Sequence, residues 1–321
     1  MNWSYCRGST IVDKLVLIIK SIRVVHWIKN IVVFAPIIFS GFLFVPGYFS
    51  KVVWVFILFC LLSSSIYLFN DIIDIESDRL HPFKKNRPIA SGKIPIEFAV
   101  FMFIFLSGIA LWLGIVTSTF FFMTMGLYFV INICYTLWLK QVSILDVFVI
   151  AAGFVIRVYA GSSIINVHMD VWFLLTVVSA SLFLAVGKRR SEMTLLTGAH
   201  IDVKNLRTTL VHYTPALLDA YTSMFANTTW LSYALFSFLH PPFTAEGRVL
   251  KLFDLLPKTL LVDKWLMATV PVVIFGVMRY MQLIYEKSQG ESPHKIIMSD
   301  KPLLIVVGLW GVMVITILYF I

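Results

Sequence analysis

Long apolar segments dominate this sequence and constrain what it can fold into. A transmembrane helix needs about 20 mainly apolar residues, and the chain carries a series of segments of about that length. They cover residues 24–44, 52–73, 95–115, 119–138, 144–163, 171–186, 217–238, 265–284 and 302–321. Hydrophobic residues make up 59% of the 321 residues and charged residues only 13%, which excludes a soluble or disordered chain. The sequence therefore predicts an all-α polytopic membrane bundle of about nine transmembrane helices, forming one domain over residues 1–321.

The distribution of basic residues predicts how this bundle is oriented. With the amino terminus in the cytoplasm, the loops on that side hold 20 of the 26 Lys and Arg residues, and the opposite side holds five. Cytoplasmic loops carry the excess of Lys and Arg in membrane proteins. We therefore expect a protein of the cell (inner) membrane whose amino terminus and active-site loops, 74–95 and 187–212, face the cytoplasm.

Carboxylates gather at the end of the second apolar segment. Asn70, Asp74 and Asp78 are spaced by four residues, so they share one helical face, and Asp71 lies next to Asp74 on it. Stacked carboxylates repel each other and are costly at membrane depth. Oxygen ligands without His or Cys favour a hard ion such as Mg²⁺, which commonly also holds substrate phosphates. A solvated acidic helix end and a cation-transport site are the alternatives.

A strongly basic loop follows the carboxylates. Its prolines and glycine predict a compact turn rather than a helix, so Lys84, Lys85 and Arg87 can reach back over the acidic face. A metal ringed by Lys and Arg is a site for a polyphosphate. An anchor to anionic lipid is the alternative use of single lysines. Nucleic-acid binding is not expected, because these charges lie beside the hydrocarbon layer.

Other polar residues occur singly in apolar surroundings. Arg157 lies deep in the fifth segment, three helical turns after Asp146 and on the same face; an intramembrane ion is functional by default, although a structural tie would also explain it. Lys29, Tyr67 and Lys140 are candidates for contacting substrate oxygens. Their alternatives are a lysine that extends to the headgroups, an interfacial tyrosine and a topological charge.

The motif Asn70-Asp71-x-x-Asp74-x-x-x-Asp78, followed by Arg87-Pro88-Ile89-Ala90-Ser91-Gly92, resembles the first aspartate-rich motif of the UbiA-type intramembrane prenyltransferase superfamily. The similarity extends over nearly the whole chain. It implies that Asp71, Asp74 and Asp78 are catalytic, and that Mg²⁺ binds at Asn70 and Asp74 and through it the diphosphate of the donor.

The chain departs from the aromatic prenyltransferases of that superfamily after the sixth segment. Where they have a second aspartate-rich motif, this sequence has Lys188, Arg189 and Arg190, with Glu192 as the one carboxylate. The segment resembles the polyprenyl-phosphate (decaprenyl-phosphate) phosphoribosyltransferases, as do residues 27–36, 135–140, 145–157 and 300–303. Ordinary basic flanking of a membrane span is the alternative explanation of the three cations.

This resemblance implies a Mg²⁺-dependent transferase. It would move 5-phosphoribose from 5-phosphoribosyl 1-diphosphate to a polyprenyl phosphate, giving polyprenylphosphoryl-5-phosphoribose and diphosphate for cell-wall or surface-glycan pentoses. The expected substrate-binding residues are Lys29, Tyr67, Lys84, Arg87, Tyr135, Lys140, Arg157, Lys188, Arg189 and Glu192, with the cations open to either substrate's phosphates. The alternatives are an aromatic prenyltransferase that uses a polyprenyl diphosphate, and a membrane transporter. A homo-oligomer is compatible with the sequence.

Overall fold

The computed structural model describes residues 11–80, 84–198, 213–240, 264–286, 296 and 298–320, and all regular structure in these ranges is helical. The elements are α1 (Ile11–Ser21), η2 (Val24–Phe34), α2 (Ala35–Phe39), α3 (Tyr48–Ile73), α4 (Ile75–Leu80), η3 (Lys84–Asn86), α5 (Ile96–Thr117), α6 (Thr119–Leu137), η4 (Leu139–Gln141), α7 (Leu145–Ile165), α8 (Val171–Gly198), α9 (Pro215–Leu239), η8 (Trp265–Thr269), α11 (Val270–Glu286) and α13 (Lys301–Phe320). The predicted all-α membrane bundle is confirmed.

Seven helices of the described chain are long and apolar enough to cross a membrane, and a pair bent by 48° near the start of the chain would make eight. This pair is α1 with η2 and α2, whereas the expected first span, residues 24–44, begins after α1. The remaining predicted segment is α9, which is long enough but carries many hydroxyl groups. Those of Thr222, Thr229 and Ser237 donate to backbone carbonyls one turn earlier in the same helix, so α9 satisfies them without other partners.

The sixth segment differs from the prediction at its end. We expected it to end at residue 186 and a loop to cover 187–212, but α8 continues as a helix to Gly198. The loop prediction was therefore wrong for 187–198, and residues 199–212 lie outside the described part of the chain. The helix can continue because Arg189 and Arg190 each face a carboxylate of a neighbouring helix.

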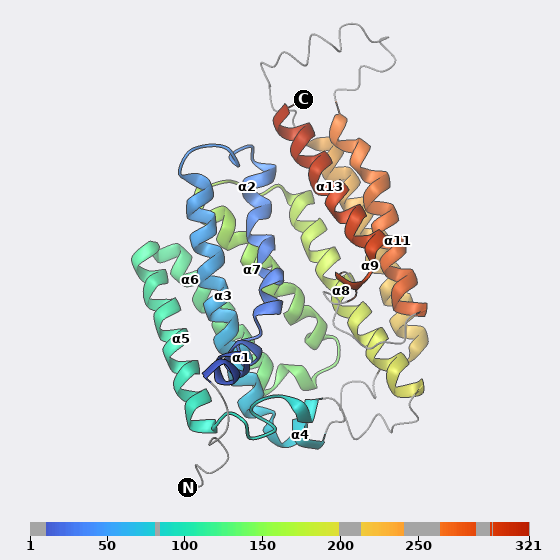
Figure 1. Ribbon diagram of the computed structural model, residues 1–321. Helices are drawn as coiled ribbons and strands as arrows, with labels where there is room; N and C mark the ends of the chain where they lie inside the picture. The colour runs from blue at the N-terminus through green and yellow to red at the C-terminus, as the bar shows by residue number, and fades with distance from the viewer. Residues whose placement is uncertain are drawn as a thin grey trace, which may run out of the picture.

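The helices form two groups that stand side by side (Figure 1). One group holds η2, α2, α3, α5, α6 and α7, and the other holds α8, α9, α11 and α13. Between η2 and α7 the backbones approach so closely that a Cβ on Gly161 would lie 2.2 Å from the carbonyl oxygen of Val33. Only glycine fits there, which fixes the first span against α7.

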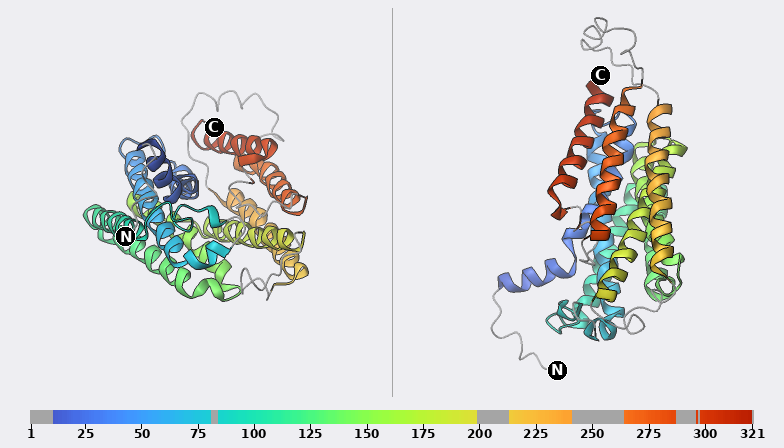
Figure 2. Two further views of the ribbon diagram at one scale, coloured as in Figure 1. Left: turned by 60° about the horizontal axis from the view of Figure 1, so that its bottom comes forward. Right: turned by 90° about the vertical axis from the view of Figure 1, so that its right-hand side faces the viewer.

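One end of the bundle collects the polar segments. The carboxyl ends of α3, α6 and α8 and the amino ends of α5, α7 and α9 lie there, together with α4 (Figure 1). Helix α1 lies across this end rather than along the bundle (Figure 2). The charged residues predicted to bind substrate therefore lie at this end. The exceptions are Lys29 in η2 and Arg157 in α7, which lie deeper in the bundle.

Candidate active site

The acidic motif lies where α3 passes into α4. Asp74 caps α3 with φ −90° and ψ 8°, which breaks the helix for one residue. The hydrogen-bond pattern nevertheless continues: the Asp74 N–H donates to the Asn70 carbonyl (3.0 Å), and the Asp78 N–H donates to the Asp74 carbonyl (2.8 Å). The predicted spacing by four residues therefore still places these three residues along one side of the chain.

Arg87 closes over two of the carboxylates. Its Nη1 lies 3.0 Å from Oδ1 of Asp71 and also contacts Oδ2 of Asp78. Both carboxylates are buried, with 3% and 2% of the residue exposed, so a single guanidinium bridges two charges that would otherwise repel each other. The predicted return of the basic loop over the acidic face is confirmed for Arg87.

Arg23 makes a contact with the site that the sequence analysis missed. It pairs with Oδ1 of Asp71, and its guanidinium lies 5.0 Å from the centre of the Tyr67 ring. Its backbone is left-handed (φ 53°), at the corner between α1 and η2. No local spacing could reveal this pair, because 48 positions separate the partners; the one signal was a cation directly before the first apolar segment.

Asp74 has a different partner. Its Oδ1 accepts a hydrogen bond from Nζ of Lys140, which η4 carries to the site from the other side. Both side chains remain partly exposed, Asp74 at 23% and Lys140 at 20%. Lys140 is therefore no isolated topological charge, since it meets the acidic motif directly.

The donor set can be compared with the needs of Mg²⁺. Within the described residues, no three His, Cys, Asp or Glu side chains surround a common point, because Asp71 and Asp78 are turned toward arginines. Asn70 and Asp74 remain, both half-buried, and the ammonium of Lys140 shows that a cation fits against Asp74. Mg²⁺ commonly takes one or two carboxylates and completes its shell with water and phosphate oxygens, so these two oxygen ligands fit the ion.

Arg157 forms a second centre deeper in the bundle. Its Nε donates to Oδ1 of Asn30 (2.7 Å), Nη1 donates to the Gly153 carbonyl (2.8 Å) and Nη2 donates to the Tyr128 hydroxyl (2.6 Å). Only 5% of Arg157 is exposed, and all three acceptors are neutral. Asp146, three turns earlier on the same face, pairs with Arg189, so this cation has no carboxylate partner among the described residues.

Lys29 adds a second positive charge to this centre. It is half-buried and lies close enough to Arg157 and Arg23 for their charges to repel. A buried cation is costly without an opposite charge. Lys29 and Arg157 together therefore make a region that favours an anion, such as a phosphate group.

The three cations of α8 are used unequally. Arg189 is fully buried, with Nε 2.7 Å from Oδ2 of Asp146 and Nη1 2.7 Å from Oε2 of Glu192. Arg190 pairs with Asp219 of α9. Lys188 lies 3.7 Å from Oε1 of Glu192 and keeps 34% of its side chain exposed. Of the three, Lys188 thus has the most exposed side chain, and the arginines hold α8 against α7 and α9.

The other two predicted binding residues lie close to these groups. Tyr135 is in the last turns of α6, near enough to Arg189 to interact with its charge. Lys84 begins η3, on the segment that carries Arg87. The predicted residues therefore form three groups: the acidic motif with its cations, the Arg157 centre deeper inside, and the α8 cations with Glu192 and Tyr135.

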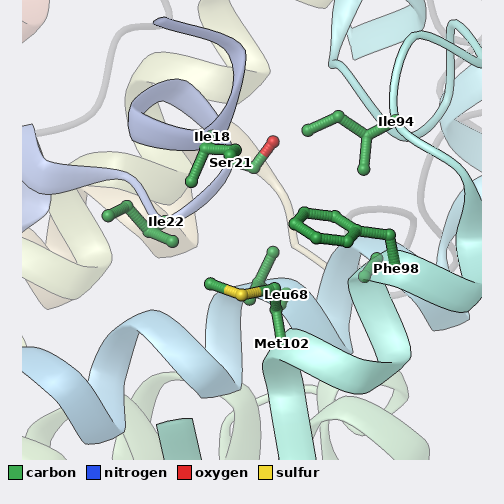
Figure 3. A pocket seen from close by; sticks show the side chains of 8 residues that line it. Ile18, Ser21, Ile22, Leu68, Ile94, Phe98 and Met102 are labelled. Carbon is green, nitrogen blue, oxygen red and sulfur yellow. The ribbon is translucent and has the colours of Figure 1, made fainter. Parts of the chain in front are cut away.

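A small apolar pocket lies beside the site, between α1, α3 and α5 (Figure 3). Ile18, Leu68, Phe98 and Met102 line it, and the hydroxyl of its one polar side chain, Ser21, donates to the Leu17 carbonyl. Its volume of about 10 Å³ suits a single water-sized sphere. This pocket is therefore a packing gap and carries none of the site's chemistry.

Known proteins resemble this chain over most of its length. It is 30% identical over 298 residues to the decaprenyl-phosphate phosphoribosyltransferase of Corynebacterium glutamicum, covering 91% of this chain and 83% of the relative. It is 32% identical over 299 residues to the protein of the same name from Mycolicibacterium smegmatis, covering 91% and 89%.

A solved structure shows the same fold. The UbiA homolog from Archaeoglobus fulgidus bound to GPP and Mg²⁺ superposes with a TM-score of 0.66 at 19% identity, covering 94% of this chain and 99% of that one. The model of the UbiA prenyltransferase family matches residues 33–300. The chain therefore belongs to the UbiA prenyltransferase family.

Proposed function

We propose that this protein transfers 5-phosphoribose from 5-phosphoribosyl 1-diphosphate to a polyprenyl (decaprenyl-type) phosphate. The products are polyprenylphosphoryl-5-phosphoribose and diphosphate. The observation that carries the proposal is the α8 segment, where three cations and one carboxylate stand in place of a second set of metal ligands. The names of the two relatives point to the same reaction.

The donor has anionic groups at both ends of its sugar, and the site offers two regions to match them. Asn70 and Asp74 would hold Mg²⁺, which neutralises charge on the departing diphosphate. Lys140, Lys84 and Lys188 bind the donor's phosphate oxygens at the same end of the bundle. Lys29 and Arg157 favour an anion deeper inside, which suits the second phosphate.

The proposed reaction does not require the protein to transfer a proton. The bond between C1 and the diphosphate oxygen breaks, and an oxygen of the lipid phosphate forms the new bond to C1 from the opposite face. As in glycosyl transfer generally, C1 becomes positively charged in the transition state. No strong general base is needed, because the attacking phosphate is already ionised. Arg87 and Arg23 keep Asp71 and Asp78 in place beside the reacting groups.

The location follows from the same chemistry. The donor is soluble in water and the acceptor's tail is soluble in the bilayer, so the reacting groups have to meet at a membrane surface. The basic residues gather at the end of the bundle that holds the acidic motif. By the preference of basic residues for the cytoplasmic side, this end faces the cytoplasm, and the protein resides in the cell (inner) membrane.

One assay tests the proposal. Purified protein is incubated with Mg²⁺, labelled 5-phosphoribosyl 1-diphosphate and several polyprenyl phosphates, and the lipid is analysed by mass. We expect a lipid heavier by one phosphoribosyl group, and none when a chelator is present. Prenyl transfer from a polyprenyl diphosphate to an aromatic acceptor, without labelling of the lipid phosphate, would instead identify an aromatic prenyltransferase. Absence of turnover with either donor would favour a transporter.

A further inference from the structure

The turn between η4 and α7 contains a strained residue. Ile144 has φ 70° and ψ −52°, a region that β-branched side chains rarely enter and that is typical of the strained γ-turn. Such strain persists only where the surroundings over-determine it, and it concentrates at functional sites. Nearly half of the Ile144 side chain is exposed, so its own packing does not hold the turn.

A tyrosine from another part of the chain holds this turn. The Tyr213 hydroxyl accepts a hydrogen bond from the Ile144 N–H (2.6 Å) and donates one to Oδ1 of Asp146 (3.0 Å). The second oxygen of Asp146 is held in turn by Arg189 at 2.7 Å. Tyr213 is 3% exposed, and Asp146 and Arg189 are fully buried.

The state of the phenol suits this double role. Burial is the main cause that raises the pKa of Tyr213, to about 12. The hydroxyl therefore keeps its proton at neutral pH and can donate to Asp146 while it accepts from Ile144.

The turn transmits this restraint to the acidic motif. The Val142 N–H donates to the Leu139 carbonyl (3.2 Å), and the Asp146 N–H donates to the Val142 carbonyl (3.1 Å). These bonds join Asp146 and η4 without a break. Lys140 lies within η4 and reaches Asp74, so a change in the turn at Ile144 displaces the lysine.

From these contacts we infer that Tyr213 is a positioning residue for the transfer reaction: by fixing Ile144 in its strained conformation, it places Lys140 opposite Asp74. The inference rests on the proposed function in so far as Lys140 binds a donor phosphate. Tyr213 itself touches no substrate, and its effect passes through the 139–146 backbone.

Three variants test this role: Tyr213→Phe, Ile144→Gly, and the two combined. The phenylalanine variant loses only the hydroxyl, so the turn relaxes away from positive φ and Lys140 moves. Displacements of about 1 Å can cost up to about 100-fold in rate, and we expect kcat/KM to fall by about tenfold or more, chiefly through a higher KM for the sugar donor. Glycine adopts positive φ freely, so the double variant should recover most of that loss. A double variant as impaired as Tyr213→Phe would overturn the inference.

Tyr221→Phe is the matched control. Tyr221 lies in α9, eight positions after Tyr213, and the described part of the chain offers its hydroxyl no hydrogen-bond partner. We expect wild-type kinetics from it. Should Tyr213→Phe not fold, the double variant decides, because it must fold and transfer if relief of the strained turn is what matters.

A second measurement needs no turnover. Acylation of Lys140 by an amine-reactive ester, read by mass spectrometry against the exposed Lys85, reports whether the Asp74 contact persists. We expect several-fold faster labelling in Tyr213→Phe and a return to the wild-type rate in the double variant. Unchanged labelling refutes the positioning role. If the variants show the expected labelling but the wild-type protein transfers no phosphoribose, the proposed function is refuted and the positioning of Lys140 by Tyr213 is not.

Discussion

Lys140 places its ammonium group against the carboxylate of Asp74, although 66 positions separate them in the sequence. The contact joins the break between α3 and α4 to the short helix η4, so it brings a cation to the centre of the acidic motif. Asp74 is also a proposed ligand of Mg²⁺. Binding of the ion with the donor diphosphate would therefore release Lys140 from Asp74 toward a phosphate oxygen nearby.

Replacing Asp74 should abolish transfer and leave the fold intact. Asp74→Asn removes the charge needed for the metal and for Lys140. The side chain is partly exposed and its ion pair is with one lysine, so the stability cost should not exceed about 1 kcal/mol. We expect at least a 100-fold loss of kcat, measured in the lipid-labelling assay, with an unchanged melting temperature. Glu76→Gln, an exposed carboxylate two residues further on, should behave as the wild type; full activity of Asp74→Asn would remove the metal from the scheme.

The part of the site that the sequence predicts is the part encoded by local spacing. Asn70, Asp74 and Asp78 recur every four residues. Arg87 follows only nine positions after Asp78, so the short loop keeps it near the carboxylates. The helical segments follow in the same way from apolar runs. Such features depend on neighbours within a few turns, which a sequence displays directly.

Long-range pairing is what the sequence could not supply. Arg157 and Asp146 share a helical face, yet Asp146 faces Arg189 of α8 and Arg157 faces Asn30 of η2. Which helix lies against which side of α7 decides these partners, and the close approach at Gly161 sets that packing. For the same reason the pairing of Arg23 with Asp71 could not be predicted from the sequence.

Arg23 should matter for both stability and activity. Arg23→Gln leaves the buried Asp71 with Arg87 alone. Removing one partner of a buried carboxylate is strongly destabilising, and Asp71 adjoins the proposed metal ligands. We expect a lower melting temperature together with a loss of kcat. Lys20→Gln, an exposed cation of α1 nearby, should change neither; an equal effect of the two variants would show that general charge at this surface is responsible.

The two arginines of α8 offer a comparison within one helix. Asp146→Asn weakens the hold on fully buried Arg189, and it should cost about 3 kcal/mol or more, as for a broken buried pair. Asp219→Asn weakens the pair of Arg190 with a carboxylate that is 40% exposed, so it should cost about 1 kcal/mol or less. Thermal unfolding in one detergent measures both. Similar shifts in melting temperature would contradict the structural role assigned to Arg189.

Replacing Arg157 tests whether this intramembrane cation binds substrate or only stabilises the fold. Its hydrogen-bond acceptors are neutral and its other contacts are with the rings of Tyr128 and Phe154, so no carboxylate of the described residues balances the charge. Arg157→Met removes the charge and keeps much of the apolar volume. We expect the KM for the sugar donor to rise by about tenfold or more, because hydrogen bonds to a charged group are each worth about 1.5–3 kcal/mol. The melting temperature should fall little, since replacing a buried charge by an apolar group is often neutral.

Arg279→Met is the matched control for Arg157→Met, and we expect the opposite effects from it. Arg279 pairs with Asp300 at 2.8 Å, which in turn accepts the N–H of Leu303 at the start of α13. Breaking this pair should lower the melting temperature and leave the KM for the donor unchanged, because neither partner belongs to the proposed site. If Arg157→Met instead behaves like Arg279→Met, with lost stability and an unaltered KM, Arg157 is a structural tie. That result would mean that the charge of Arg157 is balanced within the protein and not by a phosphate of the donor.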